Sequence, residues 1–127
     1  RKNRLVLSVF AREIDFVDEI EESARTNQIF LDGYICKEPI YRKTPLGREI
    51  CDVMLAVPRA FHRADYLPCI LWGRTAQEAS QCAIRDTIRI YGRLQSRIYT
   101  KATVSGVEER TAYEISALSA EFPEELL

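Results

Sequence analysis

Histidine, tryptophan and methionine each occur only once in this chain of 127 residues. The single histidine, His62, leaves little material for the acid–base and metal chemistry that histidine usually supplies in enzymes. The chain also has no GxSxG, HExxH or P-loop motif and no glycine-rich dinucleotide turn. We therefore expect a non-catalytic protein.

Long apolar runs are missing as well, and no secretory signal is recognisable. We therefore expect a cytoplasmic protein without membrane contact. The four cysteines, Cys36, Cys51, Cys69 and Cys82, form no CxxC pair. Cys51 and Cys69 fall on the core-facing side of predicted strands, where a free thiol packs as a small apolar side chain. Buried thiols are thus favoured over a disulfide or a metal site, and no metal or other cofactor is expected.

Net positive charge is also absent, since the formal net charge is −1. The charges are unevenly distributed, however, because residues 42–101 contain eleven Lys and Arg against five Asp and Glu. The compensating acidic residues cluster on either side, in residues 13–22 and 121–125. The central segment therefore has a basic excess that suits a polyanionic partner.

Two predicted strands combine aromatic rings with arginines. In residues 65–74, alternation places three apolar side chains on one face and Tyr66, Ile70 and Trp72 on the other, and only one face can be the core. In residues 88–94 the same alternation directs isoleucine and leucine inward and places Arg89, Tyr91 and Arg93 on the opposite face. A sheet face with rings and guanidinium groups suits single-stranded nucleic acid, because bases stack on rings and cations neutralise phosphates.

Strand patterns are predicted near residues 4–17, 28–37, 48–58, 65–73, 86–99 and 108–122, with a short helix near 75–83. Residues 45–47 form a predicted turn, and residues 101–107 a predicted loop. This order indicates an all-β protein: a five-stranded OB-fold barrel with one short helix, plus an extra N-terminal strand.

Several segments occur in the order and at the spacing of a known family: residues 29–34, 41–47, 52–59 and 111–115, together with the two strands above. In this respect the chain resembles the bacterial single-stranded DNA-binding proteins, which have an OB-fold, from Asn27 to about Phe122. The resemblance implies base stacking by Phe61, Tyr66, Trp72 and Tyr99, with Arg97 as a basic position beside the last ring. Three positions that resemble family tryptophans hold Phe61, Tyr66 and Tyr99, so weaker stacking is expected there.

The basic residues expected to contact phosphates are Arg42, Lys43, Arg59, Arg74, Arg93 and Arg97. No catalytic and no metal-binding residue is predicted. The expected function is non-catalytic binding of single-stranded DNA in replication, repair or recombination. Homo-oligomers and replication proteins are further expected partners. Two alternatives stay open, namely an OB-fold protein-interaction or assembly module (primosome-like) and a single-stranded RNA-binding domain.

Residues 4–19 align without gaps with residues 110–125, with four identical positions. Chance similarity and an internal repeat both account for this alignment. On the repeat interpretation, residues 4–17 are the last strand of a preceding OB domain, and the chain is a fragment of a tandem-OB protein. We expect residues 1–26 to form an extra strand and an acidic linker, residues 27–122 the OB domain and residues 123–127 a short acidic tail. The extra strand should pair with a sheet edge of its own barrel or of a second copy.

Overall fold

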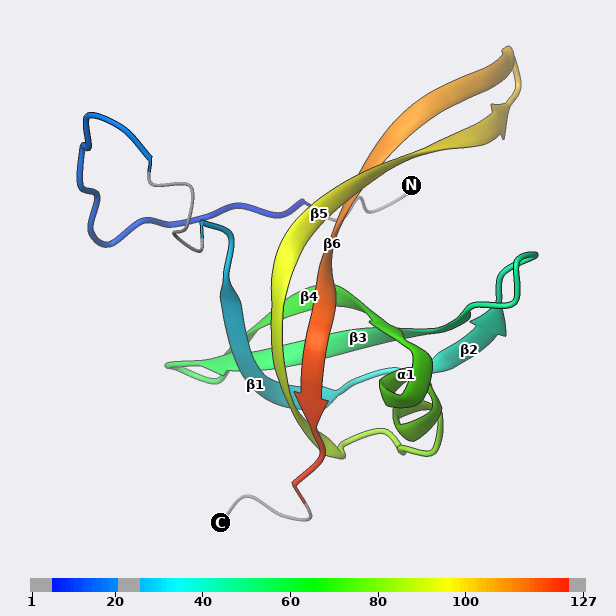
Figure 1. The fold of residues 1–127 in the computed structure, drawn as a ribbon, viewed down its shortest axis with the longest axis horizontal. Coiled ribbons are helices and arrows are strands. Elements are labelled where there is room, and N and C mark those ends of the chain that lie inside the picture. The colour runs from blue at the N-terminus through cyan, green and yellow to red at the C-terminus, as the bar shows by residue number, and fades with distance from the viewer. Residues whose placement is uncertain (1–5, 21–25, 124–127) are drawn as a thin grey trace.

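A strongly curled β-sheet dominates the fold, and α1 packs against β3 and β4 (Figure 1). The computed structural model describes residues 6–20 and 26–123. In chain order the elements are β1 (Ile29–Ile35), β2 (Ile40–Lys43), β3 (Glu49–Arg59), β4 (Arg63–Trp72), α1 (Gly73–Ser80), β5 (Thr87–Thr103) and β6 (Gly106–Glu121). The strand predictions from residue 28 onward are confirmed to within a few residues, except at the loop predicted over 101–107.

The sheet closes into a barrel because β1, at one end of the sheet order, pairs with β3 as well as with β5. That order is β1-β5-β6-β4-β3-β2, and β1 also pairs with β3 through Tyr34↔Ala56 and Ile35↔Leu55. The β4–β6 pairing is parallel, and the other pairings are antiparallel. Five strands thus form the closed barrel and β2 extends the edge of β3, which confirms the predicted OB-fold.

Alternation along the strands separates a core face from an outer face. The buried apolar side chains come from every barrel strand and from α1, and include Ile35, Val53, Leu55, Leu71, Ile88, Ile90, Ile115, Ala76 and Ala79. Each fully buried leucine or isoleucine contributes roughly 1.5–3 kcal/mol to folding. Cys51 and Cys69 belong to this core as predicted, and Leu67 packs against it. The other faces of β3, β4 and β6 point away from this core, and Ile50 and Ile70 on them are buried as well.

The loop predicted over residues 101–107 is wrong. β5 continues to Thr103 and β6 begins at Gly106, so only Val104 and Ser105 connect them. Gly106 has a φ of +133°, and the Thr103 hydroxyl donates a 2.9 Å hydrogen bond to its carbonyl oxygen. Threonine and valine favour strands, and here they outweigh the turn residues of the segment. The resulting long hairpin projects beyond the barrel (Figure 1).

The sequence patterns predict neither β2 nor the first residue of α1. All four residues of β2 are exposed, so no buried face marks them as a strand, and only pairing with β3 orders them. The helix begins at Gly73 rather than near residue 75. Gly73 has a φ of +58°, which lets the chain pass directly from β4 into α1.

The extra N-terminal strand predicted over residues 4–17 is wrong for the described residues, because residues 6–17 form no strand. Their apolar side chains are largely exposed, including Val9, Phe10 and Phe16. Alternation of apolar residues alone does not form a strand, because the backbone groups also need a pairing partner, and none of the described strands pairs with this segment. Pairing with a second copy stays a prediction, as do the proposed domain boundaries. Positions 4, 5 and 21–25, and the tail residues 124–127, lie outside the described residues.

Within the described part of the chain, no helix has the length and hydropathy needed to cross a membrane. The four cysteines are free, with Cys51 and Cys69 buried and Cys36 and Cys82 half-buried. Burial raises the pKa of the Cys51 thiol to about 11 and that of Cys69 to about 12. Both groups are therefore neutral apolar fillers at physiological pH.

Candidate nucleic-acid interface

Strand register brings six of the ten predicted site residues to one face of the sheet. Residues paired across neighbouring strands point to the same side. The pairs Arg42↔Ile50 and Ile50↔Trp72 connect β2, β3 and β4. The pairs Ile70↔Ser116 and Arg93↔Ser116 extend the same side to β6 and β5. We call this surface the outer sheet face. Its predicted site residues are Arg42, Tyr66, Trp72, Arg93, Arg97 and Tyr99.

The other four predicted site residues lie elsewhere. Lys43 points to the opposite side of β2 from Arg42, because neighbouring residues in a strand alternate. Arg59 pairs with Arg63 at the end of the β3–β4 hairpin, and Phe61 is 89% exposed in its turn with a φ of +65°. Arg74 lies in the first turn of α1. The structure therefore does not place these four with the main group.

Three rings on the outer sheet face differ in how firmly they are held. Tyr66 is 54% exposed and Tyr99 37% exposed. Trp72 is half-buried, and its indole Nε1 donates a 3.1 Å hydrogen bond to the hydroxyl of Ser116, a residue that is only 6% exposed. The indole is thus fixed in one orientation against β6, while the two tyrosines are more exposed.

A buried carboxylate organises the middle of the outer sheet face. Glu114 is 7% exposed and accepts hydrogen bonds from Gln95 at 2.9 Å and from the Arg97 Nε at 3.2 Å. The Arg97 guanidinium also lies over the Tyr99 ring, with 5.8 Å from Cζ to the centroid. Glu114 and Tyr99 together hold Arg97 in place, and the glutamate partly offsets its charge.

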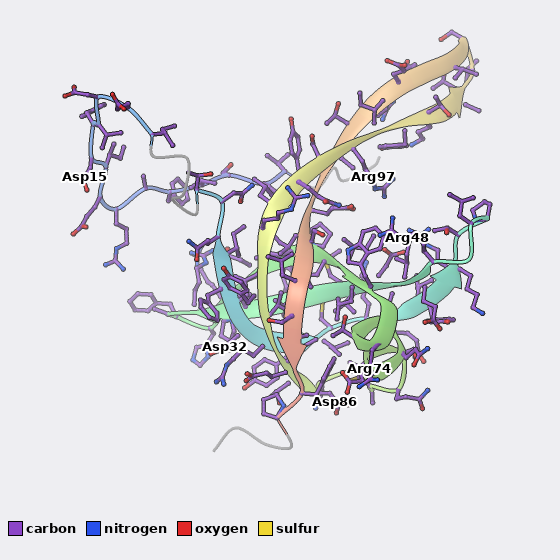
Figure 2. All side chains as sticks on the ribbon, in the orientation of Figure 1. Asp15, Asp32, Arg48, Arg74, Asp86 and Arg97 are labelled. Atoms are coloured by element: carbon purple, nitrogen blue, oxygen red, sulfur yellow. The ribbon has the colours of Figure 1, made fainter. Side chains whose placement is uncertain are left out.

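The residues predicted to contact phosphates fall into two groups, those that form an ion pair with a carboxylate and those that do not. Arg42 forms an ion pair with Asp52 at 3.1 Å, Arg59 with Asp65 at 2.9 Å and Arg97 with Glu114 at 3.2 Å. Lys43, Arg74 and Arg93 form no ion pair with any described residue. Arg93 is therefore the unpaired cation, among those predicted, that also lies on the outer sheet face. Figure 2 labels Arg97 beside the long β5–β6 hairpin and Asp32 on the other side of the barrel.

The outward-facing residues of β5 that precede Gly92 differ in charge and packing from those that follow it. Arg89 is neutralised by ion pairs with Asp32 at 2.7 Å and Glu121 at 3.3 Å. Tyr91 contacts Phe30 of β1, with ring centroids 5.0 Å apart. A register shift at Tyr91/Gly92 separates this region from the residues around Arg93. The basic character is thus concentrated on residues 93–99 of β5.

Residues 6–10 of the N-terminal segment, residues 6–20, lie beside the outer sheet face. Leu7 lines a cavity of about 400 Å³ together with Pro68, Arg97 and Tyr99. Val6, Leu7, Ser8 and Phe10 line a second cavity of about 580 Å³ with Tyr66 and Leu67. Residues 6–10 therefore lie next to two of the predicted stacking rings.

Sequence reasoning missed four residues of this surface: Arg48, Gln95, Glu114 and Ser116. Arg48 lies over the Trp72 ring, and the other three form the hydrogen bonds described above. Glu114 and Ser116 alternate with the apolar Ile115 and Ala117, so strand periodicity alone could have assigned them to the outer face. Arg48 had no comparable signal, because its position depends on a turn.

Comparisons with known proteins agree with this fold. Residues 26–123 match the model of the single-strand binding protein family. The chain is 38% identical over 80 residues to single-stranded DNA-binding protein B of Bacillus subtilis, covering 58% of this chain and 71% of that protein. It is 31% identical over 107 residues to the single-stranded DNA-binding protein of Bacillus cereus, covering 77% of this chain and 60% of that protein.

A solved structure shows the same architecture. The crystal structure of the wild-type single-stranded DNA binding protein from Thermus aquaticus superposes with a TM-score of 0.66 and 26% sequence identity. The superposition covers 87% of this chain and 46% of that one. The chain thus spans less than half of the Thermus protein and between half and three quarters of the Bacillus relatives.

Proposed function

The chain belongs to the single-strand binding protein family, and we propose that it binds single-stranded DNA through its outer sheet face without catalysis. The observation that carries this proposal is the register that brings Tyr66, Trp72 and Tyr99 to the same surface as Arg93 and Arg97. Rings on one surface offer stacking platforms for bases, and the arginines on the same surface are available for the phosphates.

The four predicted residues outside the outer sheet face extend this proposal. The turn that carries Phe61 and the first turn of α1 with Arg74 lie at the two ends of β4. A DNA strand that lies along β4 would pass Arg74, Trp72, Tyr66 and then Phe61 in that order. Arg42 and Arg59 must first leave their carboxylate partners, so we expect smaller contributions from them than from Arg93.

The biological setting is part of the proposal. We propose a role in DNA replication, repair or recombination in the cytoplasm, with replication proteins and further copies of the chain as partners. The names of the Bacillus and Thermus relatives support DNA as the ligand. A stacking surface of this kind also accepts RNA unless the 2′-hydroxyl is read.

A fluorescence titration with oligothymidylate at two salt concentrations tests the proposal, because Trp72 is the only tryptophan. We expect binding to change the Trp72 emission and to weaken as salt rises, since phosphate contacts release counterions. Trp72→Ala should weaken binding by about 1–3 kcal/mol, the range for one stacking aromatic. Labelled oligothymidylate reports binding of this variant, and circular dichroism checks its fold.

Competition with an RNA oligonucleotide of the same length separates DNA from RNA binding. Preference for the RNA would replace the DNA proposal by the RNA-binding alternative. Absence of any salt-sensitive oligonucleotide binding by the folded protein would reject the proposed function and favour the protein-interaction module.

A further inference from the structure

Arg48 lies over the Trp72 indole, with 4.9 Å between its guanidinium carbon and the ring centroid. This separation is within the range in which a cation is attracted by the face of an aromatic ring. Arg48 precedes β3 directly, and Ile50 pairs with Trp72 across the β3–β4 ladder. The contact therefore joins the β2–β3 turn to the outer sheet face. Figure 2 labels Arg48 near this turn.

The β2–β3 turn holds the Arg48 backbone through Thr44. The Thr44 amide donates to the Arg48 carbonyl at 2.8 Å, and the Arg48 amide donates to the Thr44 hydroxyl at 3.1 Å. The Gly47 amide donates to the Thr44 carbonyl at 2.8 Å, and Gly47 has a φ of +87°, which favours glycine. These hydrogen bonds fix the Arg48 backbone, and its side chain lies over Trp72 from that position.

The charge of Arg48 is not neutralised by an acidic neighbour. Among the described residues Arg48 forms no ion pair. The adjacent Glu49 is engaged elsewhere, because it accepts hydrogen bonds from the Tyr41 hydroxyl at 2.5 Å and from Gln77 at 2.6 and 2.8 Å. These bonds lower the pKa of Glu49, so it stays ionised with its own partners.

We propose that Arg48 is a further nucleic-acid-contacting residue and that Trp72 positions it for a phosphate. This inference rests on the proposed function. The ring attracts the guanidinium without offering a strong hydrogen-bond acceptor, so the donors of Arg48 remain available for phosphate oxygens. Trp72 is itself fixed by Ser116, so the turn, Arg48, the indole and β6 form one connected unit. Trp72 then contributes to the electrostatic part of binding as well as to stacking.

Salt dependence distinguishes this role from stacking alone. Anisotropy of fluorescein-labelled oligothymidylate is measured across a salt series for the wild-type chain, Arg48→Ala, Trp72→Leu, Trp72→Phe and the double variant Arg48→Ala/Trp72→Leu. Arg48→Ala should weaken binding several-fold and lower the slope of log K against log salt by about 0.7, the value for one phosphate of a single strand. Trp72→Leu should lower the slope as well, and the double variant should lower it no further. Trp72→Phe keeps a ring and should keep most of the slope.

Lys37→Ala is the matched control, because Lys37 is exposed, lies between β1 and β2, and forms no ion pair with a described residue. It should leave the slope unchanged. An unchanged slope for folded Arg48→Ala would remove Arg48 from the interface. A Trp72→Leu variant that binds more weakly with the wild-type slope would show that Trp72 acts by stacking alone. Failure of the wild-type chain to bind the oligonucleotide would reject the proposed function itself, and this inference with it.

Discussion

At the scale of single residues, the outer sheet face shows that similar arginines have different surroundings. Arg93 and Arg97 lie four positions apart on β5 and point to the same side. Arg93 is exposed and forms no ion pair with a described residue, whereas Arg97 is held by the buried Glu114 and the Tyr99 ring. A phosphate can therefore be neutralised fully by Arg93, but at Arg97 it competes with a carboxylate.

We predict that Arg93→Ala lowers the salt slope of oligothymidylate binding by about 0.7, and that Arg97→Ala lowers it less. Both variants should weaken binding to different base sequences alike, because phosphate contacts carry no sequence information. Salt titrations on two oligonucleotides of different sequence provide the measurement. Thermal unfolding is needed as a control, because Arg97→Ala leaves Glu114 without its cation. A larger slope change for Arg97 than for Arg93 would contradict the pairing argument.

At the scale of elements, β5 and β6 are much longer than the other strands and form both a barrel wall and a projecting hairpin. The barrel curls where the register shifts at Tyr91/Gly92. At Gly92 the two strands approach so closely that a Cβ atom would collide with the Ser116 carbonyl oxygen. The absence of a side chain is thus required there, and the same crossing positions the Ser116 that fixes Trp72.

Gly92→Ala should therefore destabilise the fold by about 1–3 kcal/mol, the usual cost of forcing additional atoms into a packed site. Urea unfolding followed by circular dichroism measures this change in the free energy of unfolding. Ser96→Ala serves as the control on the same strand, because Ser96 is exposed, and it should change stability by less than about 0.5 kcal/mol. Equal stability of the two variants would show that the crossing relaxes without cost.

At the scale of the whole molecule, the N-terminal segment is the part of the chain that lies outside the barrel. Phe10 and Phe16 are more than nine-tenths exposed, and several aliphatic side chains of residues 6–20 are also exposed. Exposed apolar groups in this number are typical of a surface that another chain covers. The same segment lines cavities beside Tyr66 and Tyr99. The segment therefore matters both for association with another chain and for access of a ligand to Tyr66 and Tyr99.

We propose that this segment pairs with a second copy, and we predict that deletion of residues 1–26 therefore lowers the oligomeric state in solution. Analytical ultracentrifugation of the full and truncated chains gives the masses, and thermal unfolding compares their stabilities. A charge-reversal variant outside the segment, such as Lys37→Glu, controls for changes in net charge. If the truncated chain keeps both the mass and the stability of the parent, the segment has no such role.

The sequence alone determined the barrel fold, the family and two of the rings on the outer sheet face. These conclusions follow from local patterns: alternation within a strand assigns Tyr66 and Trp72 to one side and Cys69 to the core whatever the partner strands are. Family membership likewise depends on the order and spacing of short segments, which are visible without coordinates.

Only the tertiary structure decided which arginines have a partner and where the elements without a clear sequence pattern, such as β2, lie. The pairing of Arg97 with Glu114 and the contact of Arg48 with Trp72 join positions 17 and 24 residues apart, and they depend on the register between strands. β2 exists because β3 offers an edge, whereas none of the described strands pairs with residues 6–17. Hydrogen bonding between strands is a property of the assembled sheet, so no pattern within one segment could reveal it.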